Sequence, residues 1–278
     1  MQTYERAGLV FDLDDSGPAG APAVVALHGF PQDRSAWSGV TPHLVDAGYR
    51  VLAPDQRGYS PGARPTARAA YRQTELVADV LALLDAAGID KAHVLGHDWG
   101  GVVGWSLGAN AADRLHSLTV VSTPHPRAMA AAAVRGGQAL RSWYTGVFQL
   151  PALPERVLTA AGGALARRAL LATGLDRDSA RAYTARLDTP AAMAGALAWY
   201  RAVPLDRGAS GPVAVPTRYV WGSADPALGW AAAAGTAAWA RGPYRFDVLD
   251  GVGHWIPERE PALLARLVLE HLAATAPA

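Results

Sequence analysis

The sequence predicts an α/β protein built on a mostly parallel, doubly wound sheet that an all-helical segment interrupts. Short apolar runs ending in polar or glycine-rich loops alternate with stretches of helical periodicity, as expected when helices connect parallel strands. From about 125 to 208 this alternation stops, and alanine-rich helical sequence broken by Pro and Gly replaces it. At 278 residues the chain is long enough for a large core domain with an inserted lobe.

The predicted elements begin with an antiparallel pair of strands over 3–14, turned near Ala7 and Gly8. Apolar runs then predict buried strands at 23–27, 50–53, 92–95, 117–121, 217–221 and 244–249. Helices are predicted over 74–87, which has one apolar face, and over 261–272. The predicted organisation is a core of 1–124 and 208–278 with a helical cap of 125–207.

Composition argues against several classes of partner. The formal net charge is +1, with acids and bases spread along the chain, so we expect neither a nucleic acid nor a membrane surface as partner. Charged residues interrupt the first fifteen positions and no run of eighteen apolar residues occurs, which predicts a cytoplasmic protein. The chain has no cysteine and no HxH or HExxH spacing, so no metal or cofactor is expected. A monomer and a dimer both remain open.

The sequence Gly-His-Asp-Trp-Gly-Gly at 96–101 predicts a tight turn from a buried strand into a helix. Small residues in a nucleophile elbow let strand and helix approach closely and leave the central side chain above the sheet. Here the central residue is Asp98, where such turns usually carry serine. The N-terminus of the following helix favours an anion. We predict that Asp98 is a carboxylate nucleophile; a helix-capping aspartate is the alternative.

A carboxylate nucleophile favours a different electrophile from serine. Attack on a carbonyl would give an anhydride, whereas attack on saturated carbon gives an ester that water can hydrolyse. The expected electrophile is therefore an sp3 carbon that bears a leaving group. Epoxides and alkyl halides are the leading candidates.

Two further groups follow predicted strand ends, where functional residues of an open α/β sheet collect. Asp225 lies in Trp-Gly-Ser-Ala-Asp after the strand at 217–221, and His254 lies in Gly-Val-Gly-His-Trp after the last strand. The chain order of nucleophile, acid and histidine is that of a hydrolase triad. A turn aspartate and a surface-loop histidine are the alternatives for the two residues taken singly.

Five segments together resemble the α/β-hydrolase fold family: HGFP (28–31), DQRGYS (55–60), GHDWGG (96–101), WGSAD (221–225) and GVGHWIPE (251–258). The resemblance covers nearly the whole chain. Within that family GHDWGG is similar to the epoxide hydrolases and the haloalkane dehalogenases, both of which use an aspartate nucleophile. The resemblance implies an α/β-hydrolase fold with a helical cap and no cofactor.

Two aromatic segments of the predicted cap resemble those in which epoxide hydrolases carry paired ring-opening tyrosines. They contain Tyr144, which precedes Phe148-Gln149-Leu150-Pro151, and Tyr200, in Trp199-Tyr200-Arg201. A buried neutral phenol can donate a hydrogen bond to an oxygen that is becoming an alkoxide. Lid packing by amphipathic side chains is the alternative for both residues.

By the same resemblance, the backbone N–H groups of Phe30 and Trp99 should form an oxyanion hole. Pro31 is expected to fix this loop, for which a cis peptide bond is one means. His28 and His97 are interpreted as hydrogen-bonded structural histidines.

Asp55 and Arg57 are interpreted as a structural ion pair or a loop brace. Neither residue is expected to take part in catalysis.

The resulting hypothesis is an epoxide hydrolase that forms a hydroxyalkyl ester on Asp98 and hydrolyses it with water activated by His254 and Asp225. Phe30, Trp99 and Trp255 are candidate substrate-binding residues, and these aromatic groups favour a small apolar or aryl epoxide. A haloalkane dehalogenase is the alternative, with Trp99 and either Trp143 or Trp199 as halide donors. A further alternative is a non-catalytic member of the fold that binds a small ligand.

Overall fold

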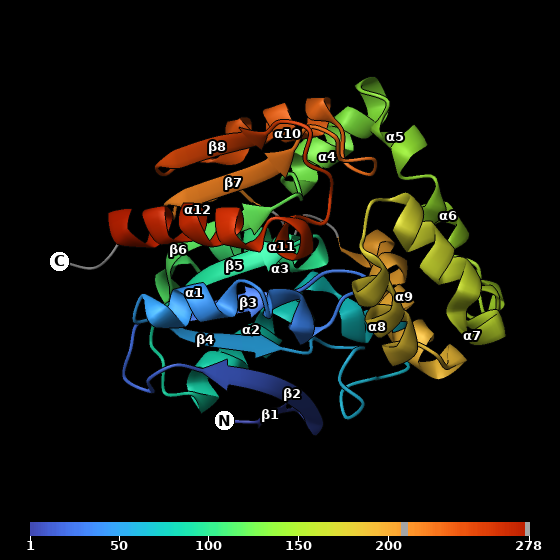
Figure 1. Cartoon of the computed structure of the whole chain (residues 1–278), viewed down its shortest axis with the longest axis horizontal. Coiled ribbons are helices and arrows are strands. Elements are labelled where there is room, and N and C mark those ends of the chain that lie inside the picture. The colour runs from blue at the N-terminus through green and yellow to red at the C-terminus, as the bar shows by residue number, and fades with distance from the viewer. Residues whose placement is uncertain (207–210, 276–278) are drawn as a thin grey trace.

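A central sheet of eight strands organises the computed structural model, which describes residues 1–206 and 211–275 (Figure 1). The strand order is β1-β2-β4-β3-β5-β6-β7-β8. β1 pairs antiparallel with β2 and β2 with β4, and all other neighbours are parallel. The strands are β1 (Thr3–Arg6), β2 (Leu9–Ser16), β3 (Ala23–Leu27), β4 (Arg50–Pro54), β5 (Ala92–His97), β6 (Leu115–Val121), β7 (Thr217–Gly222) and β8 (Tyr244–Leu249).

The sheet separates two apolar cores because successive strand residues point to opposite faces. In β3, Val25 and Leu27 join the core formed with α2 and α3, whereas Val24 and Ala26 join the core formed with α1 and α12. Both faces are thereby covered, which explains why β3 to β7 read as nearly continuous apolar runs. The helices outside the 125–207 segment are α1 (Thr41–Asp46), α2 (Gln73–Ala86), α3 (Trp99–Asn110), α10 (Trp230–Gly235), α11 (Ile256–Arg259) and α12 (Pro261–Ala274).

Between β6 and β7 the described residues form helices and connecting turns. These helices are α4 (Pro126–Arg135), α5 (Gln138–Arg141), α6 (Tyr144–Val147), α7 (Leu153–Ala172), α8 (Arg177–Arg186) and α9 (Pro190–Ala202). α6 to α9 lie together at one end of the sheet, whereas α4 packs against α10 beside β7 (Figure 1). Of the predicted cap boundaries, 125 falls just before α4, and 207/208 lies outside the described residues.

Each predicted strand and both predicted helices are present, with ends that match or differ by at most two residues. β5 continues to His97 and β6 begins at Leu115, while α12 ends at Ala274. These shifts lengthen elements whose flanking residues also find backbone partners in the sheet or helix. The predicted α/β fold is therefore confirmed. In the described part of the chain, no helix combines the length and hydrophobicity that crossing a bilayer would require.

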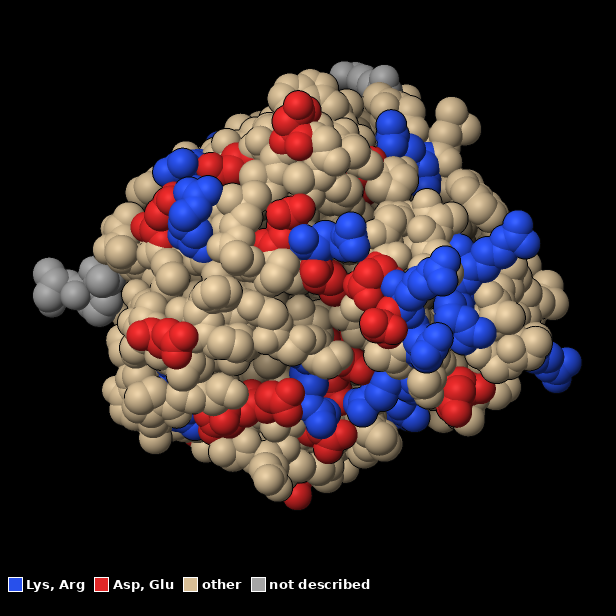
Figure 2. All heavy atoms as spheres, in the orientation of Figure 1, with Lys and Arg blue, Asp and Glu red and all other residues tan. Residues whose placement is uncertain are grey.

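Ion pairs and buried hydrogen bonds join the helical segment to the sheet. Arg186 of α8 pairs with Asp55 and with Asp33, the latter at 3.3 Å between Nε and Oδ2. The Trp199 indole N–H donates to the carbonyl oxygen of Arg57 at 2.7 Å. In Figure 2, acidic and basic side chains lie next to one another where the helical segment meets the rest of the molecule.

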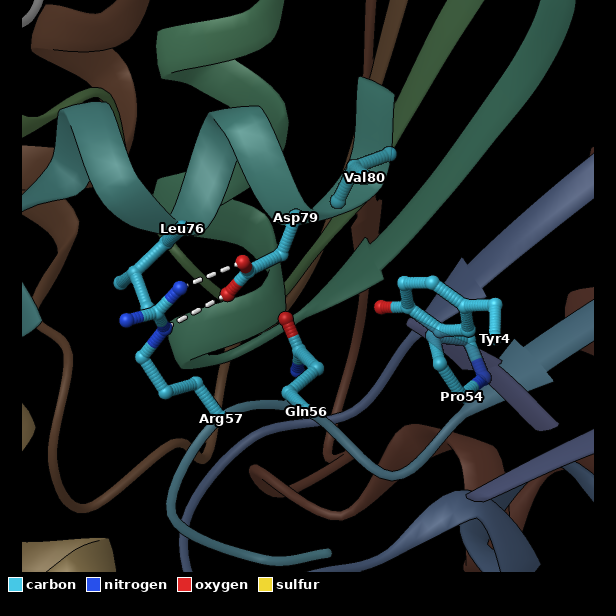
Figure 3. Close-up of a pocket in the computed structure, with 7 residues that line it drawn as sticks. All are labelled: Tyr4, Pro54, Gln56, Arg57, Leu76, Asp79 and Val80. Carbon is cyan, nitrogen blue, oxygen red and sulfur yellow. Dashed lines mark hydrogen bonds and ion pairs between the residues drawn. The ribbon is translucent and has the colours of Figure 1, made fainter. Parts of the chain in front are cut away.

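The contacts of Asp55 and Arg57 agree with their interpretation as loop braces, but the two residues do not pair with each other. Asp55 pairs with Arg34 at 2.5 Å and with Arg186. The Arg57 guanidinium donates to both carboxylate oxygens of Asp79, at 2.5 and 2.7 Å, beside a pocket of about 10 Å³ that Tyr4 also lines (Figure 3). Each residue braces its loop against a different element because the chain turns sharply between them, at the end of β4.

Replacing Trp105 by alanine should lower the free energy of unfolding by about 3–5 kcal/mol. The Trp105 side chain is fully buried in α3 and its indole N–H donates to the carbonyl oxygen of Thr123 at 3.1 Å. Chemical denaturation of the two proteins measures the difference. The matched control is Trp143→Ala, since Trp143 is 69% exposed and should change the value by less than about 1 kcal/mol. Equal losses in both variants would contradict the assignment of Trp105 to the core.

Candidate active site

The turn between β5 and α3 holds Asp98 in a strained backbone conformation. Its φ is +49° and its ψ is −118°, values that a residue with a side chain adopts only when its surroundings enforce them. The constraint is the close approach of α3 to β3: a Cβ on Gly100 would lie 2.1 Å from the carbonyl oxygen of Leu27. Glycine at 100 therefore lets the helix start directly behind Asp98, whose side chain projects away from the sheet.

Backbone N–H groups surround the Asp98 carboxylate. The Phe30 N–H donates to Oδ1 at 2.8 Å, and the Trp99 N–H adds a second backbone hydrogen bond. Burial raises the pKa of Asp98, while the charge of His254 and these two N–H groups act in the opposite direction. The Phe30–Pro31 peptide bond is cis. The Phe30 N–H thus holds Oδ1, and Oδ2 faces His254.

His254 lies between two carboxylates. Its Nδ1 is 2.7 Å from Asp225 Oδ2, and its Nε2 is 3.8 Å from Asp98 Oδ2. The other oxygen of Asp225 accepts from the N–H groups of Ala227 and Leu228 at 2.8 and 2.9 Å, which fixes the carboxylate. Burial disfavours the charged imidazole, but Asp225 above all, and then Asp98, raise the pKa of His254 to about 9.

An aromatic cluster covers Asp98 from the cap. The Tyr200 ring stands edge-on to Trp99 at 4.9 Å and to Phe30 at 5.3 Å between centroids. Tyr144 packs 6.2 Å from Tyr200, and Phe148 contacts both tyrosines. Burial raises the pKa of Tyr144 and of Tyr200, and the Asp98 charge adds to both shifts, so the phenols stay neutral. The two tyrosines selected from the sequence therefore lie together on the side of Asp98 that faces the cap.

Trp255 occupies a different position from the other candidate substrate-binding residues. Its ring stands edge-on to His254 at 5.0 Å, and its indole N–H donates to Thr173 Oγ1 of the loop after α7 at 3.0 Å. The side chain is 5% exposed. Trp255 thus packs behind His254 and joins it to the cap, and its substrate-binding role stays a prediction.

The interpretation of His28 and His97 as hydrogen-bonded structural residues agrees with their contacts. His28 Nδ1 lies 2.9 Å from the carbonyl oxygen of Gly29, and its Nε2 accepts from the Gln56 N–H at 3.1 Å. His97 Nδ1 lies 2.8 Å from Gln32 Oε1, and its Nε2 lies 3.0 Å from the carbonyl oxygen of His254. Burial lowers the pKa of both histidines.

Sequence reasoning missed two polar residues beside this site, Gln32 and Glu258. The Gln32 Nε2 group donates to Glu258 Oε1 at 2.6 Å, and the Gly29 N–H donates to Gln32 Oε1 at 2.7 Å. A signal was present, because Gln32 directly follows HGFP and Glu258 ends the GVGHWIPE segment. Neither residue type, however, stands out chemically without its buried neighbours.

A cavity of about 100 Å³ opens beside Phe30. Apart from the polar atoms of Tyr183 and Thr184, its walls are apolar side chains of the HGFP loop and of the cap. They are Phe30, Pro31, Phe148, Leu158, Ala166, Ala169, Leu170, Tyr183, Thr184, Leu187 and Met193. Within the described ranges, no group of three or more His, Asp or Glu side chains is arranged to hold a metal ion.

Replacing Asp225 by asparagine should lower the pKa of His254 from about 9. The carboxylate stabilises the imidazolium, so its loss favours the neutral ring. NMR titration of labelled histidine, with His254→Gln to assign the resonance, measures the shift. Asp113→Asn, at an exposed site, is the control.

The same change has a consequence for stability. Because the folded-state pKa of His254 lies above the ordinary value of 6.5, its contribution is full below pH 6.5 and is lost as pH rises through about 9. Asp225→Asn should therefore show a smaller loss of unfolding free energy across this range than the unchanged protein. An unaltered titration and pH profile would contradict the assigned role of Asp225.

The sequence and the fold can be compared with those of known proteins. Residues 22–261 match the family model described as alpha/beta hydrolase fold. The chain is 35% identical to "AB hydrolase superfamily protein YfhM" of Bacillus subtilis, with 98% of this chain and 97% of that protein covered. It is 34% identical to "Epoxide hydrolase A" of Mycobacterium tuberculosis, with 95% and 94% covered.

Solved structures give a consistent result. The crystal structure of Epoxide Hydrolase A from Mycobacterium thermoresistibile superposes with a TM-score of 0.83 at 30% identity and covers 98% of this chain and 97% of that one. An epoxide hydrolase from an endophytic Streptomyces gives a TM-score of 0.84 at 27% identity, with 98% and 94% covered. The chain is therefore a hydrolase that belongs to the α/β-hydrolase fold family and resembles its epoxide hydrolases.

Proposed function

We propose that the protein hydrolyses epoxides to vicinal diols through a covalent ester on Asp98. The observation that carries this proposal is the position of the Asp98 carboxylate, between two backbone N–H donors, His254 and two cap tyrosines, the buried Tyr200 and the partly buried Tyr144. The similarity to proteins named epoxide hydrolase supports the same reaction class.

The two oxygens of Asp98 have different surroundings, which suits a two-step reaction. Oδ1 accepts from the Phe30 N–H at 2.8 Å, so Oδ2 is the oxygen available to attack an epoxide carbon. After attack, Oδ1 is the carbonyl oxygen of the ester. The donors at Phe30 and Trp99 then face the atom on which negative charge develops during ester hydrolysis.

Tyr144 and Tyr200 suit the ring-opening step. Attack by Asp98 leaves an alkoxide on the former epoxide oxygen, and that oxygen needs a hydrogen-bond donor as its charge grows. Because burial keeps both phenols protonated, each can donate. The Asp98 charge acts on both phenols, which places both hydroxyls in the neighbourhood of the carboxylate.

His254 suits the second step, and its charge state changes during the reaction. The Asp98 carboxylate is one of the groups that raise the pKa of His254. Ester formation removes that charge, so the imidazole loses its proton more readily after the first step than before it. Its Nε2 can then take a proton from water, with Asp225 fixing the ring through Nδ1. The 3.8 Å between Nε2 and Asp98 Oδ2 is too long for a hydrogen bond between them.

The haloalkane dehalogenase alternative lacks a second indole donor. Trp199, one candidate, donates its indole N–H to the carbonyl oxygen of Arg57 at 2.7 Å. Trp143, the other, is 69% exposed at the surface. Trp99 alone would remain to bind a halide. These contacts favour the epoxide as substrate.

The cavity beside Phe30 supports a small apolar or aryl substituent on the epoxide. Apolar cavities on the order of 150 Å³ accommodate a benzene ring, so about 100 Å³ suits a short alkyl chain or a small ring that overlaps the space above Asp98. The walls offer apolar contacts and little to hydrogen-bond a polar substituent.

His254→Gln should accumulate the ester, because the base for its hydrolysis is gone while the nucleophile remains. Intact-protein mass spectrometry after mixing with a small panel of epoxides should show an adduct equal to the whole epoxide mass. A panel of haloalkanes should give none, and an alkyl adduct lacking halogen would favour the dehalogenase instead.

The matched control is the double variant Asp98→Ala, His254→Gln, which should form no adduct with either panel. Absence of an adduct in His254→Gln across both panels would favour a ligand-binding protein.

Replacing both Tyr144 and Tyr200 by phenylalanine should slow ester formation from epoxides by about 10²–10⁴-fold, since no phenol then donates to the leaving oxygen. Each single variant should show a smaller loss. Single-turnover mass spectrometry in the His254→Gln background measures the rate directly. The control is Tyr49→Phe, because the Tyr49 ring packs against His93 outside the site. An unchanged rate in the double variant would assign the tyrosines to lid packing.

A further inference from the structure

A buried carboxyl group lies behind the catalytic residues and takes no direct part in the proposed reaction. Glu258 is in α11, four residues after His254. Its Oε1 accepts two hydrogen bonds, from Gln32 Nε2 at 2.6 Å and from the Tyr183 hydroxyl at 2.7 Å. Its Oε2 is buried and has no hydrogen-bond partner among the described residues. A carboxyl group left half-satisfied in the interior costs stability, so its presence calls for an explanation.

On one side, Glu258 determines how Gln32 is oriented. The Gln32 Oε1 atom accepts from the Gly29 N–H at 2.7 Å, and its Nε2 group therefore points to Glu258, which must supply an acceptor. If the side-chain amide of Gln32 were flipped, its Nε2 donor would face the Gly29 N–H, which is also a donor. The carboxyl group, together with His97 Nδ1, which lies 2.8 Å from Gln32 Oε1, thus holds the amide in the orientation that restrains the Gly29 N–H.

Gly29 precedes Phe30, and its backbone packs so closely against Asp98 that it has little room to move. A Cβ on Gly29 would lie 2.4 Å from Asp98 Cβ, so this backbone presses directly on the nucleophile. The next N–H, that of Phe30, donates to Asp98 Oδ1 at 2.8 Å. A change in the Gly29–Gln32 hydrogen bond therefore alters the position of an oxyanion-hole donor.

On the other side, Glu258 contacts the cap. Tyr183 is a buried residue of α8 that lines the cavity together with Phe30 and Pro31. Its hydroxyl reaches across to Glu258, so one carboxyl oxygen joins a wall of the cavity to the loop that carries Phe30.

We propose that Glu258 is a positioning residue, which holds the Gly29–Phe30 backbone against Asp98 through Gln32 and fixes α8 over the cavity through Tyr183. The assignment to the ester-hydrolysis step rests on the proposed function. The Phe30 N–H is needed most when charge develops on the ester oxygen, so a displaced loop slows ester hydrolysis more than ester formation.

The first test needs no substrate. In Glu258→Leu, which removes both acceptors, the amide hydrogens of Gly29 and Phe30 should exchange at least tenfold faster in NMR experiments. In Glu258→Gln, one carbonyl oxygen can still accept from Gln32 and Tyr183, so exchange should stay close to that of the unchanged protein. Glu260→Gln, two residues along the chain, is the matched control. Equal protection of Gly29 and Phe30 in Glu258→Leu and the control would overturn the proposal.

The second test follows the reaction. We expect Glu258→Leu to slow decay of the Asp98 ester by roughly 10–100-fold, while ester formation changes much less. Tyr183→Phe breaks only the contact with the cap and should raise KM more than it lowers kcat. Equal slowing of both half-reactions in Glu258→Leu would mean a general structural role and would also overturn the proposal. If the unchanged protein and Glu260→Gln form no ester, the proposed function fails, and the exchange result still decides the positioning role.

Discussion

The backbone strain at Asp98 is the constraint on which the active-site geometry depends. A non-glycine residue with a φ of +49° is held there only because β5, α3 and β3 meet at distances that leave no room for side chains. That contact aims the carboxylate away from the sheet and places the start of α3 at its base. The apolar core that contains α3 stabilises the close approach, since it buries α3 against β5 and β6.

Electrostatics then decide what this carboxylate can do. Burial disfavours the ionised forms of both Asp98 and His254, and the two groups offset this cost for each other. Asp225 further stabilises the charged His254, whereas its negative charge raises the pKa of Asp98. In the proposed reaction, esterification of Asp98 removes one of the charges that raise the pKa of His254. His254 then loses its proton more easily after the first step, which suits the proposed sequence of nucleophile and base.

The cap does more than cover Asp98. It supplies Tyr144 and Tyr200 above Asp98, and it is fastened to the core through contacts on several elements. Arg186 pairs with Asp55, the Trp199 indole donates to the Arg57 carbonyl, and Tyr183 donates to Glu258. Since these contacts end on the loop after β4 and on α11, which follows β8, the position of the cap is coupled to the segments around Asp98 and His254.

The sequence by itself determined the order of strands and helices, the elbow at Asp98 and the order Asp98, Asp225, His254 along the chain. These features depend on local periodicity and on glycine at fixed positions, which act over a few residues. It gave strand ends only to within a few residues, because pairing with a neighbour lengthens β5 and β6.

Only the tertiary structure decided which polar groups meet. Asp55 and Arg57 are two positions apart in the chain, yet Asp55 pairs with Arg34 and Arg57 pairs with Asp79. Gln32 donates to Glu258, which is 226 positions away. A hydrogen bond or an ion pair forms only when its atoms lie within a few ångströms of each other. In the folded chain, closeness in sequence does not ensure that the polar atoms are this close. Local pattern was therefore enough to propose Asp98 as a nucleophile, whereas the groups that surround it depend on how distant segments pack.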